Sequence, residues 1–325
     1  MNNQLIPQKF KDGFKVQDIS RGPKFMAIDV TNKCNFRCLH CFNSSGDENC
    51  YNFDDELTDV ELLKLVEKII KLGVSQVCLC GGEPTLRIEL VYKMVDMLSR
   101  EKITVNMVSN GYLMTKEKAR KLKKAGINSV QISVDGLGEV HNRFRNMPQA
   151  FERAVRAIRF LKEENIQVMV SCCPNNLNYR CLETYFQYIY EMGVDKIRMM
   201  PFLPLGRGDS VGKSIILNDS QLFDVARRIS KWNMDNPKLE VEWGDPINHL
   251  HNILLYRKKK PGLLSVCSNG DVKMTPYLDH VLGNVRRDSL ETIWEVGLGE
   301  KVNDPLFIKR LQRLKGIYDL NSTEV

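Results

Sequence analysis

The sequence predicts an α/β fold: a partial (βα)6 barrel of the TIM type, followed by a small α+β extension. Apolar segments with strand character alternate six times with segments of 3.6-residue periodicity. Each strand–helix unit takes about 30 residues, which is typical of right-handed βαβ units and a parallel sheet. Several predicted helices also end at a glycine, as Leu72-Gly73 and Ala125-Gly126 do. Six units are too few for a closed eight-fold barrel.

The predicted strands share apolar runs rich in β-branched residues and lie at Lys24–Thr31, Gln76–Gly82, Thr104–Asn110, Ser129–Asp135, Gln167–Cys173 and Lys196–Phe202. The predicted helices between them lie at Asp59–Leu72, Ile88–Arg100, Lys116–Ala125, Ala150–Glu164 and Leu182–Met192. In such folds ligands bind at the carboxyl ends of the strands.

The pattern changes after Phe202. A loop marked by Pro204, Gly206 and Gly208 precedes a predicted helix near Ser220–Trp232, and short strand-like pieces follow at Leu239–Trp243 and Val272–Met274. We therefore divide the chain into an N-terminal segment (1–23), a barrel (24–202) and a C-terminal region (203–325).

Composition indicates an ordinary globular protein in a reducing compartment. Of 325 residues, 43% are hydrophobic and 27% are charged, and the ten cysteines are not spaced as in secreted disulfide proteins. The N-terminal residues lack a signal-peptide pattern, and no apolar run approaches the ~18 residues of a membrane span. We expect a cytoplasmic protein without a membrane anchor.

The net charge of +7 includes the run Arg257-Lys258-Lys259-Lys260. Such runs usually form a solvated surface, and a contact with an acidic peptide is the alternative. No aromatic residues alternate with basic ones as in a nucleic-acid platform, so no nucleic-acid partner is expected.

Three cysteines directly after the first predicted strand carry the main chemical signal. Cys34, Cys38 and Cys41 are spaced C-x3-C-x2-C. Three thiolates are one fewer than those that hold an ordinary [4Fe–4S] cluster, so one iron would remain open to a cofactor or substrate. A zinc site with Cys50 as fourth ligand, and thiols without any metal, are the alternatives.

The second predicted strand ends in Cys80-Gly81-Gly82-Glu83-Pro84. Two glycines at a strand end let the backbone approach a ligand closely. Glu83 is then placed to accept a charge-assisted hydrogen bond from a ligand ammonium group.

These motifs, with Ser109-Asn110-Gly111 after the third strand and Ser133-Val134-Asp135-Gly136 on the fourth, resemble those of the radical S-adenosylmethionine (SAM) superfamily. The resemblance covers residues 24–202. It implies that Cys34, Cys38 and Cys41 bind a [4Fe–4S] cluster. It also implies that an electron from the cluster splits SAM into methionine and a 5′-deoxyadenosyl radical, which abstracts hydrogen from a substrate.

The resemblance further implies which residues contact SAM. His40 falls at the position beside the adenine, and Arg145, or else Arg143, at the position of the SAM carboxylate. Ser133 matches a ribose or carboxylate contact. The remaining predicted cofactor-binding residues are Gly81, Gly82, Glu83, Pro84, Ser109, Asn110 and Asp135.

The C-terminal region resembles the SPASM or twitch extension of one subgroup of this superfamily. The segments that carry this resemblance are Pro201–Gly208, Ser268–Val272, Leu282–Val285 and Ser289–Trp294. That subgroup holds auxiliary clusters through cysteines in this region, but here no cysteine follows Cys267. We therefore expect a cysteine-poor extension without an auxiliary cluster, so that iron content approaches four per chain.

The other thiols and polar residues remain open. Cys78 and Cys80 alternate on one strand and are expected in the packed barrel. Cys172 and Cys173 end the fifth predicted strand and are also expected to pack in the barrel. Alternatively, Cys172, Cys173 and Cys267 are candidate catalytic hydrogen-atom donors to a substrate radical. Asp245, His249, His251 and His280 are candidates for proton transfer that we do not assign.

The sequence thus predicts a radical SAM enzyme acting on a ribosomally synthesised peptide, by cross-linking or epimerisation for example. A small-molecule substrate such as a tetrapyrrole, sugar or nucleotide is the first alternative. A non-catalytic metal-binding interaction protein is the second. Expected partners are the substrate and an electron donor such as flavodoxin or ferredoxin.

Overall fold

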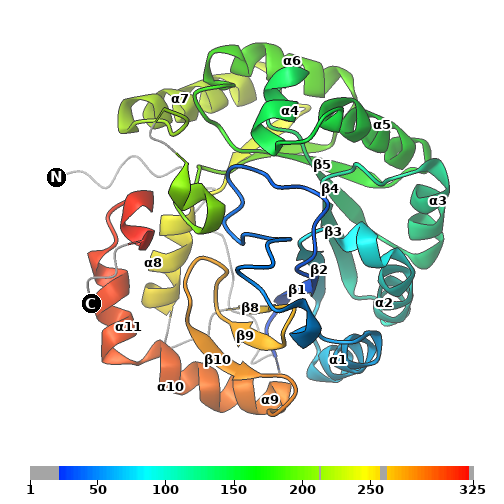
Figure 1. Ribbon diagram of the computed structural model, residues 1–325, viewed down its shortest axis with the longest axis vertical. Coiled ribbons are helices and arrows are strands. Elements are labelled where there is room, and N and C mark those ends of the chain that lie inside the picture. The colour runs from blue at the N-terminus through cyan, green and yellow to red at the C-terminus, as the bar shows by residue number, and fades with distance from the viewer. Residues whose placement is uncertain (1–21, 212–213, 257–261, 322–325) are drawn as a thin grey trace.

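The chain folds into a curved ten-stranded sheet whose outer face is covered by helices (Figure 1). This computed structural model describes residues 22–211, 214–256 and 262–321. The strand order is β10-β9-β8-β1-β2-β3-β4-β5-β6-β7, and β10 does not pair with β7. The sheet is therefore open, which confirms the predicted partial barrel. Most of the predicted N-terminal segment and the basic run at 257–260 lie outside the described residues.

Eight strands of the sheet are parallel to their neighbours within β8-β1-β2-β3-β4-β5-β6-β7. They are β1 (Phe25–Thr31), β2 (Gln76–Gly81), β3 (Thr104–Ser109), β4 (Ser129–Ser133), β5 (Gln167–Cys172), β6 (Lys196–Met199), β7 (Glu240–Trp243) and β8 (Leu263–Val266). The last two go beyond the six predicted units. The domain boundary near residue 203 stays a prediction, although strands from both sides of it share one sheet.

The helices expected in the barrel agree with the structure to within one residue. The helices are α1 (Asp59–Leu72), α2 (Ile88–Arg100), α3 (Lys116–Ala125), α4 (Glu139–Arg145), α5 (Ala150–Glu163), α6 (Leu182–Glu191), α7 (Asp219–Asp235), α8 (Pro246–Tyr256), α9 (Leu290–Thr292), α10 (Leu298–Val302) and α11 (Pro305–Arg313). Local signals explain the agreement. Thr58 and Glu61 form a capping box at the start of α1, and Gly73 ends it in the left-handed conformation.

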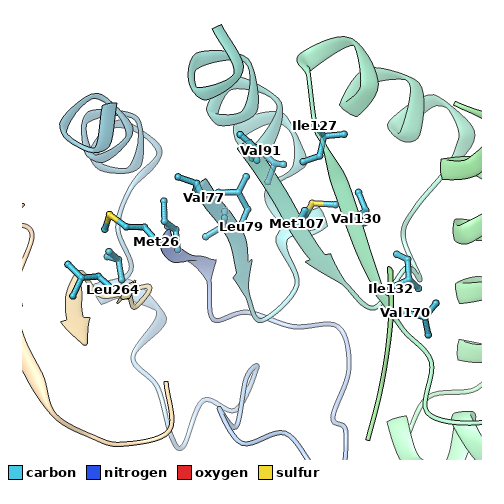
Figure 2. Close-up of a cluster of buried hydrophobic side chains, with 14 of the residues drawn as sticks. Met26, Val77, Leu79, Val91, Met107, Ile127, Val130, Ile132, Val170 and Leu264 are labelled. Carbon is cyan, nitrogen blue, oxygen red and sulfur yellow. The ribbon is translucent and has the colours of Figure 1, made fainter. Parts of the chain in front are cut away.

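The main core lies between the sheet and the helices. Met26 and Ile28 of β1 are fully buried on this outer side of the sheet, and Val77 and Leu79 of β2 lie beside them (Figure 2). Strand neighbours face opposite ways, so alternate residues such as Asp29 face the inner side and are only half-buried. Polar groups on the inner face and at the carboxyl ends of the strands are therefore free to meet a ligand.

The C-terminal hairpin extends the sheet beyond β8. The strands β9 (Asp271–Lys273) and β10 (Val281–Asn284) run antiparallel. The turn between β8 and β9 contains Gly270 at φ +91°, where a side chain would be strained. Because β8 pairs with β1, this hairpin lies on the side of the sheet that leads into the cysteine loop.

Candidate active site

The three cysteines lie in the loop that follows β1 and crosses the middle of the ring of helices (Figure 1, blue). Cys38 is buried, and Cys34 and Cys41 are half-buried. Backbone N–H groups point at two of the sulfurs: the N–H of Phe36 lies 3.4 Å from Cys34 Sγ, and that of Ser45 lies 3.4 Å from Cys41 Sγ. The loop therefore presents its thiols with hydrogen-bond donors already directed at them.

Arg207 ties this loop to the segment that follows the sixth strand. Its Nε donates to the carbonyl of Cys38 and its Nη1 to the carbonyl of Ser45, each at 3.1 Å. Its neighbour Gly206 has φ +55°, and a Cβ there would lie 2.4 Å from the carbonyl oxygen of Phe42. The Pro- and Gly-rich segment after β6 thus clamps the cysteine loop by close backbone contact.

The donor set fits an iron–sulfur cluster. Burial raises the pKa of Cys34 to about 12 and also raises that of Cys38, so thiolates form here only with cations beside them, which iron supplies. Hydrogen bonds to cluster sulfurs also tune the potential of such clusters.

The zinc alternative fits less well. In the described part of the chain, no three His, Cys, Asp or Glu side chains converge as they would around a single ion. Cys50, the fourth ligand that zinc would need, is exposed. A [4Fe–4S] cluster needs its cysteine sulfurs farther apart than a single zinc ion does, because each thiolate binds a different iron.

The two glycines after β2 pack against the chain that leads into the cysteine loop. Gly81 has φ +120°, and its Cβ would lie 2.3 Å from the carbonyl oxygen of Thr31. A Cβ on Gly82 would lie 2.1 Å from the carbonyl oxygen of Lys33. The neighbouring backbone therefore already excludes a side chain at both positions. A contact with SAM stays a prediction for both.

Glu83 is fully buried beside them and gathers hydrogen bonds from two strand ends. Its Oε1 accepts from the N–H of Thr85 at 3.1 Å and from Ser109 Oγ at 2.8 Å, and its Oε2 accepts from the N–H of Asn110 at 2.8 Å. Pro84 opens the short 3-10 turn that supplies Thr85. Ser109 and Asn110 therefore hold this carboxylate, and Oε2 keeps capacity for a ligand ammonium group.

Asp135, just after β4, is the centre of a buried polar network. Its Oδ2 accepts from Arg145 Nε at 2.5 Å and its Oδ1 from the N–H of Cys173 at 2.8 Å. Its own N–H donates to His141 Nδ1 at 2.9 Å, and its carbonyl accepts from Asn178 Nδ2 at 2.7 Å. Burial alone would raise the pKa of Asp135, but the guanidinium of Arg145, the histidines His40 and His141 and the N–H of Cys173 together outweigh it and lower that pKa.

The same network reaches the cysteine loop through Arg145 and His40. Arg145 Nη1 lies 3.8 Å from Cys38 Sγ. The ring of His40 stacks on that of Phe144 with centroids 4.2 Å apart. Burial, with Arg145 nearby, lowers the pKa of His40 to about 3, so its ring is neutral. Its Nδ1 is buried and has no hydrogen-bond partner among the described residues, and a bound cofactor would satisfy it.

The remaining predicted residues of β4 and β5 divide between the two faces of the sheet. Ser133 Oγ lies 3.5 Å from Ser171 Oγ on the inner side. Cys172 alternates with Ser171 and is buried in the core on the helix side. Cys173 packs with Phe144 and Phe202. The hydrogen-donor role of these two thiols stays a prediction.

Sequence reasoning missed a polar group on the inner face near β1. Cys80 Sγ lies 3.5 Å from Asp29 Oδ1, and burial raises the pKa of Asp29 to about 6. Lys273 of the C-terminal hairpin opposes that rise, and burial raises the pKa of Cys267 to about 12 near the same carboxyl group. The available signal was an acidic residue at an alternating position of an apolar strand.

Comparison with protein families matches residues 28–189 to the Radical SAM superfamily. The chain belongs to this superfamily. It is accordingly an enzyme, and the cofactors of its family are a [4Fe–4S] cluster and SAM. Within the described residues, every helix is too short or too polar to cross a membrane.

Individual relatives act on different substrates. The chain is similar to the Fe-coproporphyrin III synthase of Methanosarcina barkeri, with 31% identity over 234 residues, 71% of this chain and 57% of that protein. It is also similar to the sporulation killing factor maturation protein SkfB of Bacillus subtilis, with 27% identity over 278 residues, 83% of this chain and 64% of that protein.

Among solved structures, the fold matches Streptococcus suis SuiB bound to its precursor peptide SuiA. The TM-score is 0.70 at 14% identity, over 87% of this chain and 67% of that one. At this identity the match shows a common fold, and it extends beyond the barrel because 87% of the chain is covered.

Proposed function

We propose that this radical SAM enzyme modifies a ribosomally synthesised peptide by abstracting hydrogen from a side chain or an α-carbon, as the first step of a cross-link or an epimerisation. The observation that carries the proposal is the fold match to a peptide-bound maturation enzyme over 87% of this chain. Similarity to a second peptide maturation protein, SkfB, supports it.

The residues of the site divide the work of cofactor binding. Cys34, Cys38 and Cys41 would hold the cluster, which with SAM supplies a carbon radical for hydrogen abstraction. Glu83 Oε2 would accept from the SAM ammonium group, and Arg145 has guanidinium donors left over from its bond to Asp135 for the SAM carboxylate.

Ser133 and His40 would contact the ribose and adenine, and His40 has the orphaned Nδ1 that such a contact needs. The inner face of β1, β2 and the C-terminal hairpin is left for the substrate. Asp29 lies there as a candidate proton acceptor, since a buried carboxyl group with a pKa near 6 exchanges protons readily at neutral pH. The electron would come from a flavodoxin or a ferredoxin.

A tetrapyrrole substrate is the second candidate. The 31% identity to a coproporphyrin-forming enzyme favours it specifically. Either substrate would have to reach the inner face of the sheet, which the strand order leaves unclosed between β10 and β7.

The test is an anaerobic assay of the reconstituted enzyme with dithionite, SAM and one candidate substrate. One arm uses short peptides encoded beside the gene, and the other uses coproporphyrin III. We expect 5′-deoxyadenosine together with a peptide whose mass has fallen by two hydrogens, or which contains a D-residue after acid hydrolysis. A product only in the coproporphyrin arm would overturn the peptide proposal, and no 5′-deoxyadenosine in any arm would overturn the mechanism.

A further inference from the structure

Three polar side chains from distant parts of the chain meet beside the cysteine loop. Arg198 comes from β6, His249 from α8, and Tyr277 from the segment between β9 and β10. The rings of His249 and Tyr277 lie edge to face, with centroids 5.7 Å apart. Arg198 reaches the start of α8, because a Cβ on Gly244, two residues before that helix, would lie 3.3 Å from Arg198 Nε. Burial lowers the pKa of His249 and raises that of Tyr277, and the positive charge of Arg198 acts to lower both.

Arg198 has no partner for its charge. Within the described residues it forms no ion pair or hydrogen bond, and its Nε is buried. The nearest carboxylate by strand register is Glu242 of β7, but that group is engaged by Lys196 at 2.8 Å. His249 Nε2 is likewise buried without a partner. Both side chains are half-buried, and these two nitrogens are the atoms shut off from water without a partner in the described residues. Buried polar atoms are normally hydrogen-bonded, so a ligand group that reaches this place would satisfy them.

Arg198, His249 and Tyr277 lie near the residues that are expected to bind the cluster and SAM. The ring of Tyr277 is 6.2 Å from that of Phe42, the residue next to Cys41. Arg198 pairs in register with Ser171 on β5, and Ser171 in turn approaches Ser133, the predicted SAM contact. Arg198 therefore shares the inner face of the sheet with the predicted SAM contact Ser133, and Tyr277 borders the cysteine loop.

Gly244 leaves room at this place. A Cβ on it would lie 2.6 Å from Met200 Sδ and 3.3 Å from Arg198 Nε. Any side chain at this position would therefore press on the guanidinium. The glycine keeps Arg198 accessible on the side of β7.

We propose that Arg198, His249 and Tyr277 bind a carboxylate group of the substrate. The guanidinium matches a carboxylate in a two-pronged geometry, and the imidazole N–H and phenol O–H are additional donors. Burial lowers the pKa of His249, so the neutral ring supplies one N–H and the guanidinium supplies the charge. The proposal rests on the proposed function and narrows it to an acidic substrate: a peptide with a carboxylate near the reacting residue, or a tetrapyrrole propionate.

The test is calorimetric binding to the reconstituted enzyme with SAM and without reductant. The probes are the tripeptide acetyl-Ala-Glu-Ala-amide, its Gln counterpart, coproporphyrin III, its tetramethyl ester, and inorganic phosphate. We expect one acid to bind and its uncharged counterpart not to bind. The Arg198→Gln variant should weaken binding of that acid about tenfold or more, and Arg198→Lys should restore part of it. Arg156→Gln, an exposed arginine on α5, is the matched control and should bind as the wild type does.

Binding of the peptide acid or of coproporphyrin III identifies the source of the carboxylate. Equal binding of acid and uncharged probe, unchanged binding in Arg198→Gln, binding of phosphate alone, or no binding of either acid would each overturn the proposal. Cluster absorbance in each variant reports whether the protein is intact. Product formation is measured in a separate assay. A failed binding test would therefore overturn the carboxylate site and not the proposed reaction, and a failed activity assay would leave the binding result valid.

Discussion

Arg145 at the β4 end and Arg198 at the β6 end are two arginines in contrasting surroundings. Arg145 bonds to Asp135, whose other oxygen is held by the backbone of the β5 end. Arg198 has no partner in the described residues. A buried charge with its counter-ion in place keeps the folded chain together, and its removal leaves the counter-ion stranded. A charge without a counter-ion stabilises nothing until a ligand supplies one.

The largest effect is expected in the cysteine loop, which Arg145 approaches at Cys38. Replacing Cys34, Cys38 or Cys41 with Ala should abolish iron binding and 5′-deoxyadenosine formation, because three thiolates leave none to spare. Cys50→Ala is the control, since Cys50 is exposed, and it should keep about four irons per chain. Iron analysis and visible absorption measure cluster content in each variant. Loss of metal in Cys50→Ala would instead favour a four-cysteine site.

The partnered arginine is tested by Arg145→Gln. Asp135 is only 1% exposed, so its charge would remain buried without a cation, and the free energy of unfolding should fall by about 3 kcal/mol. Urea unfolding of the reconstituted and metal-free forms measures this loss. A loss below about 1 kcal/mol would show that the Arg145–Asp135 ion pair does not stabilise the fold. The contrast between Arg145 and Arg198 would then fail.

The inner face near β1 is tested through the pH dependence of stability. The pKa of Asp29 is about 6 in the folded chain against 3.8 in the unfolded chain, so the folded state binds more protons between these values. The free energy of unfolding should therefore fall by about 2 kcal/mol as pH rises from 4 to 7. Cys80, Lys273 and Glu56 face the same carboxyl group and set the size of this effect.

Asp29→Asn carries no titrating proton, so its stability should change less over this range. The difference between the two urea-unfolding profiles isolates Asp29 from other groups. Parallel profiles would mean that the carboxyl group titrates normally, and its role as a proton acceptor would lose its support.

The smallest effect on stability is expected for the unpartnered arginine. Arg198→Gln removes no ion pair within the described residues, so the free energy of unfolding should change by less than about 1 kcal/mol. Thermal unfolding beside Arg145→Gln measures the contrast directly. A loss as large as that of Arg145→Gln would assign Arg198 to the fold and would contradict the comparison.

Local signals explain most of what was predicted correctly. The periodicity of α1 and its capping residues Thr58 and Gly73 lie within one stretch of chain, so its ends agree with the structure. The spacing of the three cysteines likewise lies within eight residues and indicates a metal site without any long-range contact, and the resemblance to the superfamily then implies the cluster. Four-residue strands carry too little pattern to reveal their partner. A strand-like piece was predicted at Leu239–Trp243, where β7 lies, but not its parallel pairing with β6, and β8 was not predicted.

The sequence by itself determined the first six strands, the five helices predicted between them, the cysteine loop and the superfamily, because periodicity, caps and motif spacing act over a few residues. Only the tertiary structure decided that Cys172 faces the core, that Arg145 closes on Asp135, and that Arg198 remains without a partner. Whether a polar side chain finds a hydrogen-bond partner depends on groups from elements that are distant in the sequence. Those groups come together only in the folded chain.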